Sequence, residues 1–244
     1  DSPSIGFIKV NKKAASKPNV IIDEVCLANI ANEQLEKNKE FIKYTQPKWS
    51  GLPKSALFIL PFFRNPLAGG IRTTLSIALD LLKKWDTTIH IAILRTSNDA
   101  PPCNDLDIMA ACPELNFSYS LIDSEEDISK LPNVDISICT SWPTAYALAK
   151  FNKCKAKFYI MQDYETLFYP AGTISGLIDE TYRFGFFGIC NSKGIGDIYS
   201  KFNSNYVAFT PGVDRNIYKP SKIFNNKAPY QIVFYGRPNN DRNA

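Results

Sequence analysis

The sequence predicts an α/β fold: a Rossmann-like, mostly parallel β-sheet with helices on both faces. From residue 55 onward, apolar runs of strand length alternate with segments whose apolar residues recur at helical intervals. Some runs are continuous, such as residues 136–139, which suits strands buried on both faces of a sheet. The chain has 244 residues, of which 45% are hydrophobic, so it can bury the core of one large domain or two small ones.

Strands and helices are expected to alternate regularly. Helical spacing is clearest in residues 71–84, where Leu75, Ala78 and Leu82 share a face, and strict alternation is clearest in residues 88–94. Strands are expected at residues 56–63, 88–94, 117–122, 134–140, 156–161, 188–191 and 206–210. Helices are expected between them at residues 71–84, 144–151, 173–183 and 195–202.

Three regions are expected along the chain. Residues 1–50 form an N-terminal extension with a helix at residues 23–44, and residues 51–220 form the Rossmann-like domain. Residues 221–244 contain an apolar run at 231–235 that is typical of a buried strand. We therefore expect a linker there, followed by the first strand of a second domain that this chain does not complete.

The composition disfavours several classes of function. The formal net charge is +4 and the pI is near 8.6, which is too mild for a nucleic-acid-binding protein. This charge suits an anionic small ligand or peripheral contact with an anionic membrane. No apolar stretch reaches the roughly 18 residues that span a bilayer, and the first residues lack the features of a signal peptide. We therefore expect a cytoplasmic protein, with peripheral contact at the inner membrane face as an option.

The cysteine and histidine content disfavours a metal site. The six cysteines are scattered without a Cys-x-x-Cys pair, which predicts reduced and mostly buried thiols. The single histidine, His90, lies within a strand-like run, so a zinc site is not expected.

A glycine pair follows the first apolar run of the domain. Gly69 and Gly70 precede the helix expected at residues 71–84. Glycines permit positive φ and leave no Cβ in the way, and the helix N-terminus directs unpaired N–H groups at the space above the strand. Ligands bind at such strand ends in open α/β sheets, so this turn is a candidate site. The spacing is not Gly-x-Gly-x-x-Gly, which disfavours a nicotinamide enzyme, and the alternative is a tight turn that binds nothing.

A second group of candidate residues follows the strand expected at residues 156–161. Residues 162–165, the Gln-Asp-Tyr-Glu segment, carry two carboxylates, and further aromatic residues follow up to Tyr169. Carboxylates accept hydrogen bonds from sugar hydroxyls, and aromatic rings stack on sugar rings. A carboxylate with a suitable pKa also acts as a general base. The alternative is an exposed loop of solvated acids whose aromatic rings cover the core.

Further polar residues follow other apolar runs. Ser141 and Ser192 each stand between a strand and a helix, where a serine either faces the ligand or caps the helix, and capping is favoured for Ser192. Arg237 and Arg242 follow the apolar run at residues 231–235. They either clamp a phosphate, which guanidinium groups match in pairs, or belong to a solvated tail.

Several short motifs together resemble the GT-B-fold glycosyltransferases of family 4. Their order and spacing are most similar to the bacterial rhamnosyltransferase-like branch, which builds rhamnose-containing cell-surface glycans. The motifs lie at residues 68–74, 159–165, 167–172, 182–186, 211–220 and 233–238.

The resemblance implies two facing Rossmann-like domains. This chain would supply the N-terminal, acceptor-binding half and the first strand of the nucleotide-sugar-binding half. The resemblance implies a retaining transfer without a metal or another cofactor, in which helix dipoles and basic side chains stabilise the departing diphosphate. It places Asp163 at the catalytic step and Arg237 and Arg242 at the diphosphate, although this sequence has Gln162 where many relatives have histidine. The implied substrate-binding residues are Gly69, Gly70, Gln162, Tyr164, Glu165, Tyr169 and Asn191.

The leading hypothesis is a fragment of a retaining glycosyltransferase. It would move a sugar from a nucleotide-sugar such as dTDP-L-rhamnose to a cell-surface glycan or a lipid-linked acceptor. The chain alone is expected to lack turnover, because the donor contacts are divided between two domains. One alternative is a non-catalytic carbohydrate- or nucleotide-binding α/β module, and another is a hydrolase or epimerase that uses Asp163 and Glu165.

Overall fold

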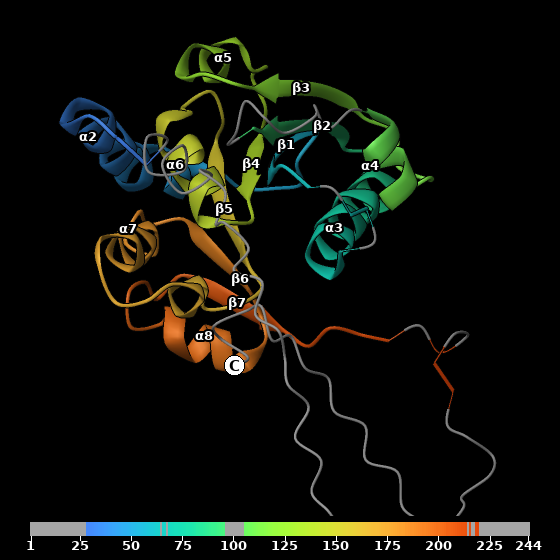
Figure 1. The fold of residues 1–244 in the computed structure, drawn as a ribbon. Helices are drawn as coiled ribbons and strands as arrows, with labels where there is room; N and C mark the ends of the chain where they lie inside the picture. The colour runs from blue at the N-terminus through green and yellow to red at the C-terminus, as the bar shows by residue number, and fades with distance from the viewer. Residues whose placement is uncertain are drawn as a thin grey trace, which may run out of the picture.

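The fold is built on one seven-stranded sheet in which all neighbouring strands are parallel (Figure 1). The computed structural model describes residues 28–63, 65–66, 68–95, 105–213, 215 and 218–219. The strand order is β3-β2-β1-β4-β5-β6-β7, which confirms the predicted fold class. The strands are β1 (Ser55–Pro61), β2 (Thr88–Leu94), β3 (Ser118–Ile122), β4 (Ile136–Cys139), β5 (Ala156–Met161), β6 (Phe187–Asn191) and β7 (Tyr206–Phe209).

Helices cover both faces of the sheet, as predicted (Figure 1). The α-helices are α2 (Asn32–Glu40), α3 (Gly69–Trp85), α4 (Asp105–Ala111), α5 (Glu125–Lys130), α6 (Trp142–Lys150), α7 (Thr173–Thr181) and α8 (Lys193–Tyr199). Successive side chains of a strand point to opposite faces. In β1, Phe58 therefore packs in one core layer with α3 and α4, while Leu57 and Ile59 pack in the other, which includes residues of α5 to α8.

The strand order places a topological switch point between β1 and β4. From β1 the chain proceeds outward to β2 and β3, and it then returns to β4 on the other side of β1. The connections that leave β1 and β4 therefore run over opposite faces, and the carboxyl ends of strands at such a switch point are the usual position of a ligand in open α/β sheets. Phe58 pairs with Ile138 in this central ladder.

The predicted elements agree with the structure except at several boundaries. The strand predicted at residues 88–94 has these bounds, whereas β1 ends at Pro61 instead of residue 63. Helix α6 begins at Trp142, two residues earlier than predicted, because Pro143 fits the first helical turn, where its missing N–H is not needed. The sequence did not indicate α4 and α5, which have only seven and six residues.

The helix predicted at residues 23–44 is shorter in its described part. Residues 28–31 are not helical, and α2 begins at Asn32. The backbone N–H of Ala31 donates to the Gln34 side-chain oxygen at 3.0 Å, which fixes the helix start there. After Glu40 the chain continues through a π-helical turn, η1 (Phe41–Thr45), and a 3₁₀ turn, η2 (Gln46–Lys48).

A buried lysine joins this N-terminal segment to the sheet. Lys157 of β5 donates from Nζ to the Oδ1 atoms of Asn38, at 2.8 Å, and Asn152, at 2.9 Å. The ammonium group also lies 4.7 Å from the centre of the Phe41 ring. Among the described residues no carboxylate forms an ion pair with it, and burial lowers the pKa of Lys157 to about 7.

The remaining predictions on cysteine and histidine can be placed in the fold. The described cysteines are free and buried, as predicted: Cys112, Cys139, Cys154 and Cys190. His90 lies in β2, where its two ring nitrogens are 2.7 and 3.0 Å from the hydroxyl oxygens of Ser118 and Ser120.

The strand predicted at residues 231–235 lies outside the described residues. Within the described ranges, no helix has both the length and the apolar content required to cross a bilayer.

Candidate functional site

The glycine pair opens helix α3 at the carboxyl edge of the sheet. Gly69 and Gly70 are the first two residues of α3, after the cap residue Ala68. Neither has a positive φ, so that part of the sequence argument is wrong; both glycines adopt ordinary helical geometry. Their lack of a Cβ matters only at Gly70, where a Cβ would lie 3.3 Å from Nε2 of Gln162. At Gly69 nothing lies within 4 Å of the corresponding position, so the backbone there is open to an approaching group.

Gln162 joins the glycine turn to the ends of β4 and β5. Its Nε2 donates to the Gly70 carbonyl oxygen at 2.9 Å and to the Thr140 hydroxyl oxygen at 3.1 Å, and it lies 3.3 Å from the hydroxyl oxygen of Thr74. The two hydroxyl oxygens lie 3.2 Å apart, and the Thr74 hydroxyl also donates to the Gly70 carbonyl. Two sequence-predicted groups therefore form one polar cluster, as expected from their positions at the same edge of the sheet.

The sequence analysis missed the two threonines of this cluster. Thr74 and Thr140 are buried, and their hydroxyls set the position of the Gln162 amide. Thr74 stands one helical turn after Gly70, and Thr140 is the first residue after β4. The sequence signal for this cluster is a residue with a hydroxyl group in the first turns of α3 and another directly after β4.

Glu165 is turned toward helix α6. Its Oε2 accepts a hydrogen bond from the backbone N–H of Trp142 at 2.7 Å and one from the Tyr159 hydroxyl at 3.3 Å. A carboxylate at this position satisfies an unpaired donor and opposes the positive end of the helix dipole. The backbone N–H of Glu165 donates to the Tyr182 hydroxyl at 3.2 Å. These contacts hold the short 3₁₀ turn η3 (Glu165–Phe168), which the sequence analysis did not predict.

Two tyrosines near Glu165 are held in the protonated state. Burial, with a smaller effect of the Glu165 carboxylate, raises the pKa of Tyr159 and Tyr182 well above the usual range. Both phenols therefore keep their protons at neutral pH, which suits Tyr159 as the donor to Glu165.

Asp163 lies between Gln162 and the η3 turn and is half-buried. Its Oδ1 accepts a hydrogen bond from the backbone N–H of Tyr164 at 2.9 Å. Because Gln162 is fixed on one side of it and Glu165 on the other, Asp163 lies on a segment that is anchored at both ends, just after β5 at the carboxyl edge of the sheet.

The remaining candidates lie around this centre. Tyr164 packs toward α7, where its hydroxyl donates to Asp179 Oδ1 at 3.0 Å. The Tyr169 ring stands edge-on to Trp142, with ring centres 6.4 Å apart. Asn191 is the last residue of β6, directly after Cys190, which pairs with Met161 of β5, so Asn191 lies at the same edge of the sheet. Arg237 and Arg242 lie outside the described residues.

The two serines considered as ligand contacts stand at helix N-termini. Ser141 is the N-cap residue of α6, and its backbone N–H donates to the Thr144 hydroxyl at 3.0 Å. Ser192 is the N-cap residue of α8. Both serines thus occupy N-cap positions, although neither side chain makes a capping hydrogen bond to the helix backbone.

Comparison with known proteins shows that the chain is similar to part of a protein named for O-antigen biosynthesis. The O-antigen biosynthesis protein RfbC of Myxococcus xanthus is 27% identical over 247 residues, a match that covers this whole chain and 19% of RfbC. The chain thus spans about a fifth of the length of this relative. No family model and no solved structure matches the chain. The similarity supports the coarser part of the resemblance, a relation to a polysaccharide-biosynthesis protein, and leaves the rhamnosyltransferase-like branch untested.

Proposed function

We propose that this chain is the acceptor-binding half of a glycosyltransferase of cell-surface polysaccharide biosynthesis. The observation that carries the proposal is the contact between Gly70 and Gln162, which unites the glycine turn and the Gln-Asp-Tyr-Glu segment beside the switch point. The similarity of the whole chain to an O-antigen biosynthesis protein supports the same conclusion independently.

The chemistry of the cluster suits a saccharide. Sugar hydroxyls both donate and accept hydrogen bonds, and the half-buried residues Gln162 and Asp163 place an amide oxygen and a carboxylate next to each other as acceptors. In the proposed transfer, an acceptor hydroxyl oxygen forms the new bond to the anomeric carbon while the bond from that carbon to the donor diphosphate breaks, and the hydroxyl proton passes to the departing diphosphate oxygen. We assign Asp163 to holding the acceptor hydroxyl. We assign the N-terminus of α3, with the open backbone at Gly69, to the departing diphosphate.

The finer features of the proposal follow the resemblance. The donor is a nucleotide-sugar, with dTDP-L-rhamnose as the first candidate, and the acceptor is a growing or lipid-linked glycan. The transfer retains configuration and needs no metal, and Arg237 and Arg242 contribute to diphosphate binding. The protein is proposed to act in the cytoplasm, where its mild positive charge favours contact with the anionic inner face of the membrane.

The engagement of Glu165 argues against the hydrolase or epimerase alternative. That alternative needs Asp163 and Glu165 as a working pair of carboxylates. In the structure Glu165 Oε2 binds the N-terminus of α6 and the Tyr159 hydroxyl, which is the environment of a helix-capping group.

The test is donor-dependent extension of a glycan acceptor by the full-length protein. Nucleotide-sugars are supplied one at a time, and the wild type is compared with Asp163→Asn and with Asp197→Asn, a matched change on the exposed side of α8. We expect Asp163→Asn to lower kcat about a hundredfold or more and Asp197→Asn to leave it unchanged. Equal rates in the two variants would remove Asp163 from the mechanism. Saccharide binding without transfer from any donor would favour the non-catalytic binding module.

A further inference from the structure

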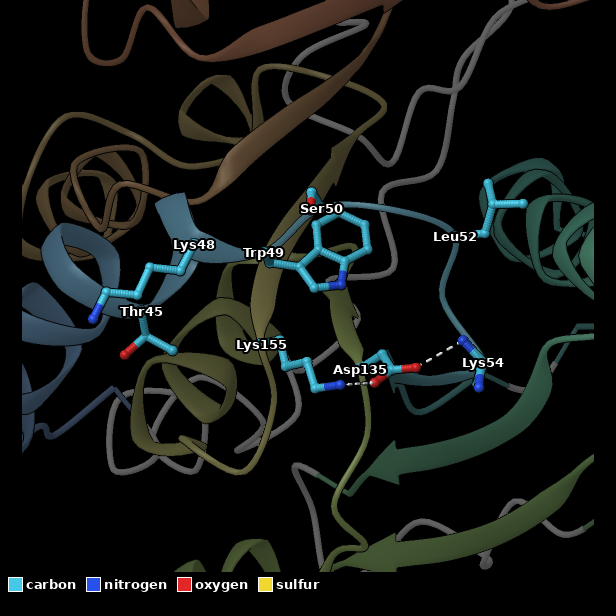
Figure 2. Close-up of a pocket in the computed structure, with 8 residues that line it drawn as sticks. All are labelled: Thr45, Lys48, Trp49, Ser50, Leu52, Lys54, Asp135 and Lys155. Carbon is cyan, nitrogen blue, oxygen red and sulfur yellow. Dashed lines mark hydrogen bonds and ion pairs between the residues drawn. The ribbon is translucent and has the colours of Figure 1, made fainter.

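An open cleft lies at the amino edge of the sheet, at the opposite ends of the strands from the Gly70–Gln162 cluster. It has a volume of about 540 Å³, within the range of small-ligand sites. It is bordered by the connection from η2 to β1 and by the residues just before β1, β4 and β5 (Figure 2). The lining residues are Thr45, Lys48, Trp49, Ser50, Leu52, Lys54, Asp135 and Lys155.

The walls of this cleft are fixed by hydrogen bonds and ring packing. The Gln46 side-chain oxygen accepts a hydrogen bond from the backbone N–H of Lys157 at 2.8 Å, which ties η2 to the start of β5. The Trp49 ring stands edge-on to Phe158 of β5, with ring centres 6.1 Å apart and an angle of 83° between the planes. The cleft is thus formed before any ligand arrives, which lowers the entropic cost of binding.

The cleft carries a surplus of positive charge. Its one aspartate, Asp135, is already engaged: Oδ1 pairs with Lys155 Nζ at 2.7 Å, and Oδ2 accepts from the backbone N–H of Lys54 at 2.7 Å. The ammonium groups of Lys48 and Lys54 form no ion pair within the described ranges. Both side chains are exposed, so the two charges are available to an anion.

We infer that this cleft binds a negatively charged saccharide, at a site separate from the one proposed for sugar transfer. The half-buried Trp49 offers an apolar surface for a sugar ring, and Lys48 and Lys54 offer charge for its carboxylate or phosphate groups. Thr45 lies beside Lys48, and Ser50 lies next to Trp49 (Figure 2). Because most lining residues are exposed, the cleft suits a section of a longer chain better than an enclosed small molecule.

The test uses the chain as it stands and a defined probe. Isothermal titration with tetragalacturonate, a uronic-acid oligomer, is compared with titration of neutral maltotetraose and of inorganic phosphate. We expect tetragalacturonate to bind with a Kd of about 1 mM or tighter, and the other two probes to bind at least about tenfold more weakly. Absence of heat from tetragalacturonate up to about 5 mM would overturn the inference. So would equal binding of maltotetraose or of phosphate.

Two variants locate the binding. Trp49→Ala is expected to weaken tetragalacturonate binding about tenfold, and Lys48→Gln combined with Lys54→Gln by a similar factor. The lysine pair is exposed, so this second variant stays informative if Trp49→Ala weakens the fold. Lys201→Gln, an exposed lysine after α8, is the matched control and should leave binding unchanged. Binding that survives both cleft variants would overturn the inference, as would binding of phosphatidylglycerol vesicles in place of the saccharide.

Discussion

The Gly70 carbonyl oxygen accepts a hydrogen bond from the Gln162 side-chain amide at 2.9 Å, across 92 residues of sequence. This contact fixes the first turn of α3 against the segment that follows β5. Thr140, the residue directly after β4, adds its hydroxyl to the same cluster. Changes at Gly70 and Gln162 should therefore affect one shared site, and the two glycines of the turn should respond differently to substitution.

Gly70→Ala should displace the Gln162 amide with little loss of stability. The new Cβ would lie 3.3 Å from Nε2, a contact that a flexible side-chain end relieves by moving, and alanine is the better helix former. Gly69→Ala meets nothing within 4 Å, so the Gln162 amide should stay in place. We expect the free energy of unfolding of each variant to lie within about 1 kcal/mol of the wild-type value. The amide NMR signals of Gln162 should shift only in Gly70→Ala, and unchanged signals there would contradict the contact.

Glu165→Ala should destabilise the protein through the loss of the α6 cap. It leaves the Trp142 N–H without its acceptor and removes a charge that favours the helix N-terminus. Loss of a cap of this kind costs about 1 to 2 kcal/mol in free energy of unfolding, measured by urea denaturation. Glu165→Gln keeps an oxygen acceptor and should cost less than Glu165→Ala. Glu36→Ala, an exposed residue of α2, is the control, and an equal loss in the control would contradict the capping role.

Three of the four described thiols, those of Cys139, Cys154 and Cys190, should resist alkylation in the folded protein. Cys139 is fully buried, and burial raises the pKa of Cys154 to about 12 and that of Cys190 to about 11, so little thiolate exists at about pH 8. Iodoacetamide labelling followed by peptide mass spectrometry should find these three cysteines unmodified before denaturation and modified after it. Rapid native labelling of Cys139 would show that the core around β4 opens.

The architecture could be predicted from the sequence because the strands are buried on both faces of the sheet. An apolar run such as residues 136–139 cannot face water, and its position between helical segments dictates a parallel sheet. The position of the glycine turn and of Gln162 at one edge followed from the same logic. The contacts within the site could not be predicted from the sequence. Thr74, Thr140 and Gln162 belong to three separate segments, and only the packing of these segments brings their side chains together. Glu165 reaches Trp142 across 23 residues, and no spacing rule of one helix or strand connects the two.

Lys157 should make the stability of the protein rise with pH above neutrality. Its pKa is lowered by burial to about 7 in the folded state and returns to about 10.5 on unfolding, so between these values the unfolded chain binds the extra proton. The contribution of Lys157 to the free energy of unfolding should therefore increase from about pH 7 to about pH 10 and be constant below that window, while the buried thiols, whose pKa values are raised by folding, act in the opposite direction above about pH 9. Lys157→Met removes this titration, although it also leaves Asn38 without its donor, so the pH slope is the informative quantity. We expect urea unfolding at several pH values to show a smaller slope in Lys157→Met and an unaltered slope in Lys201→Met. Equal slopes in the wild type and Lys157→Met would show that Lys157 is charged to the same extent in the folded and unfolded states.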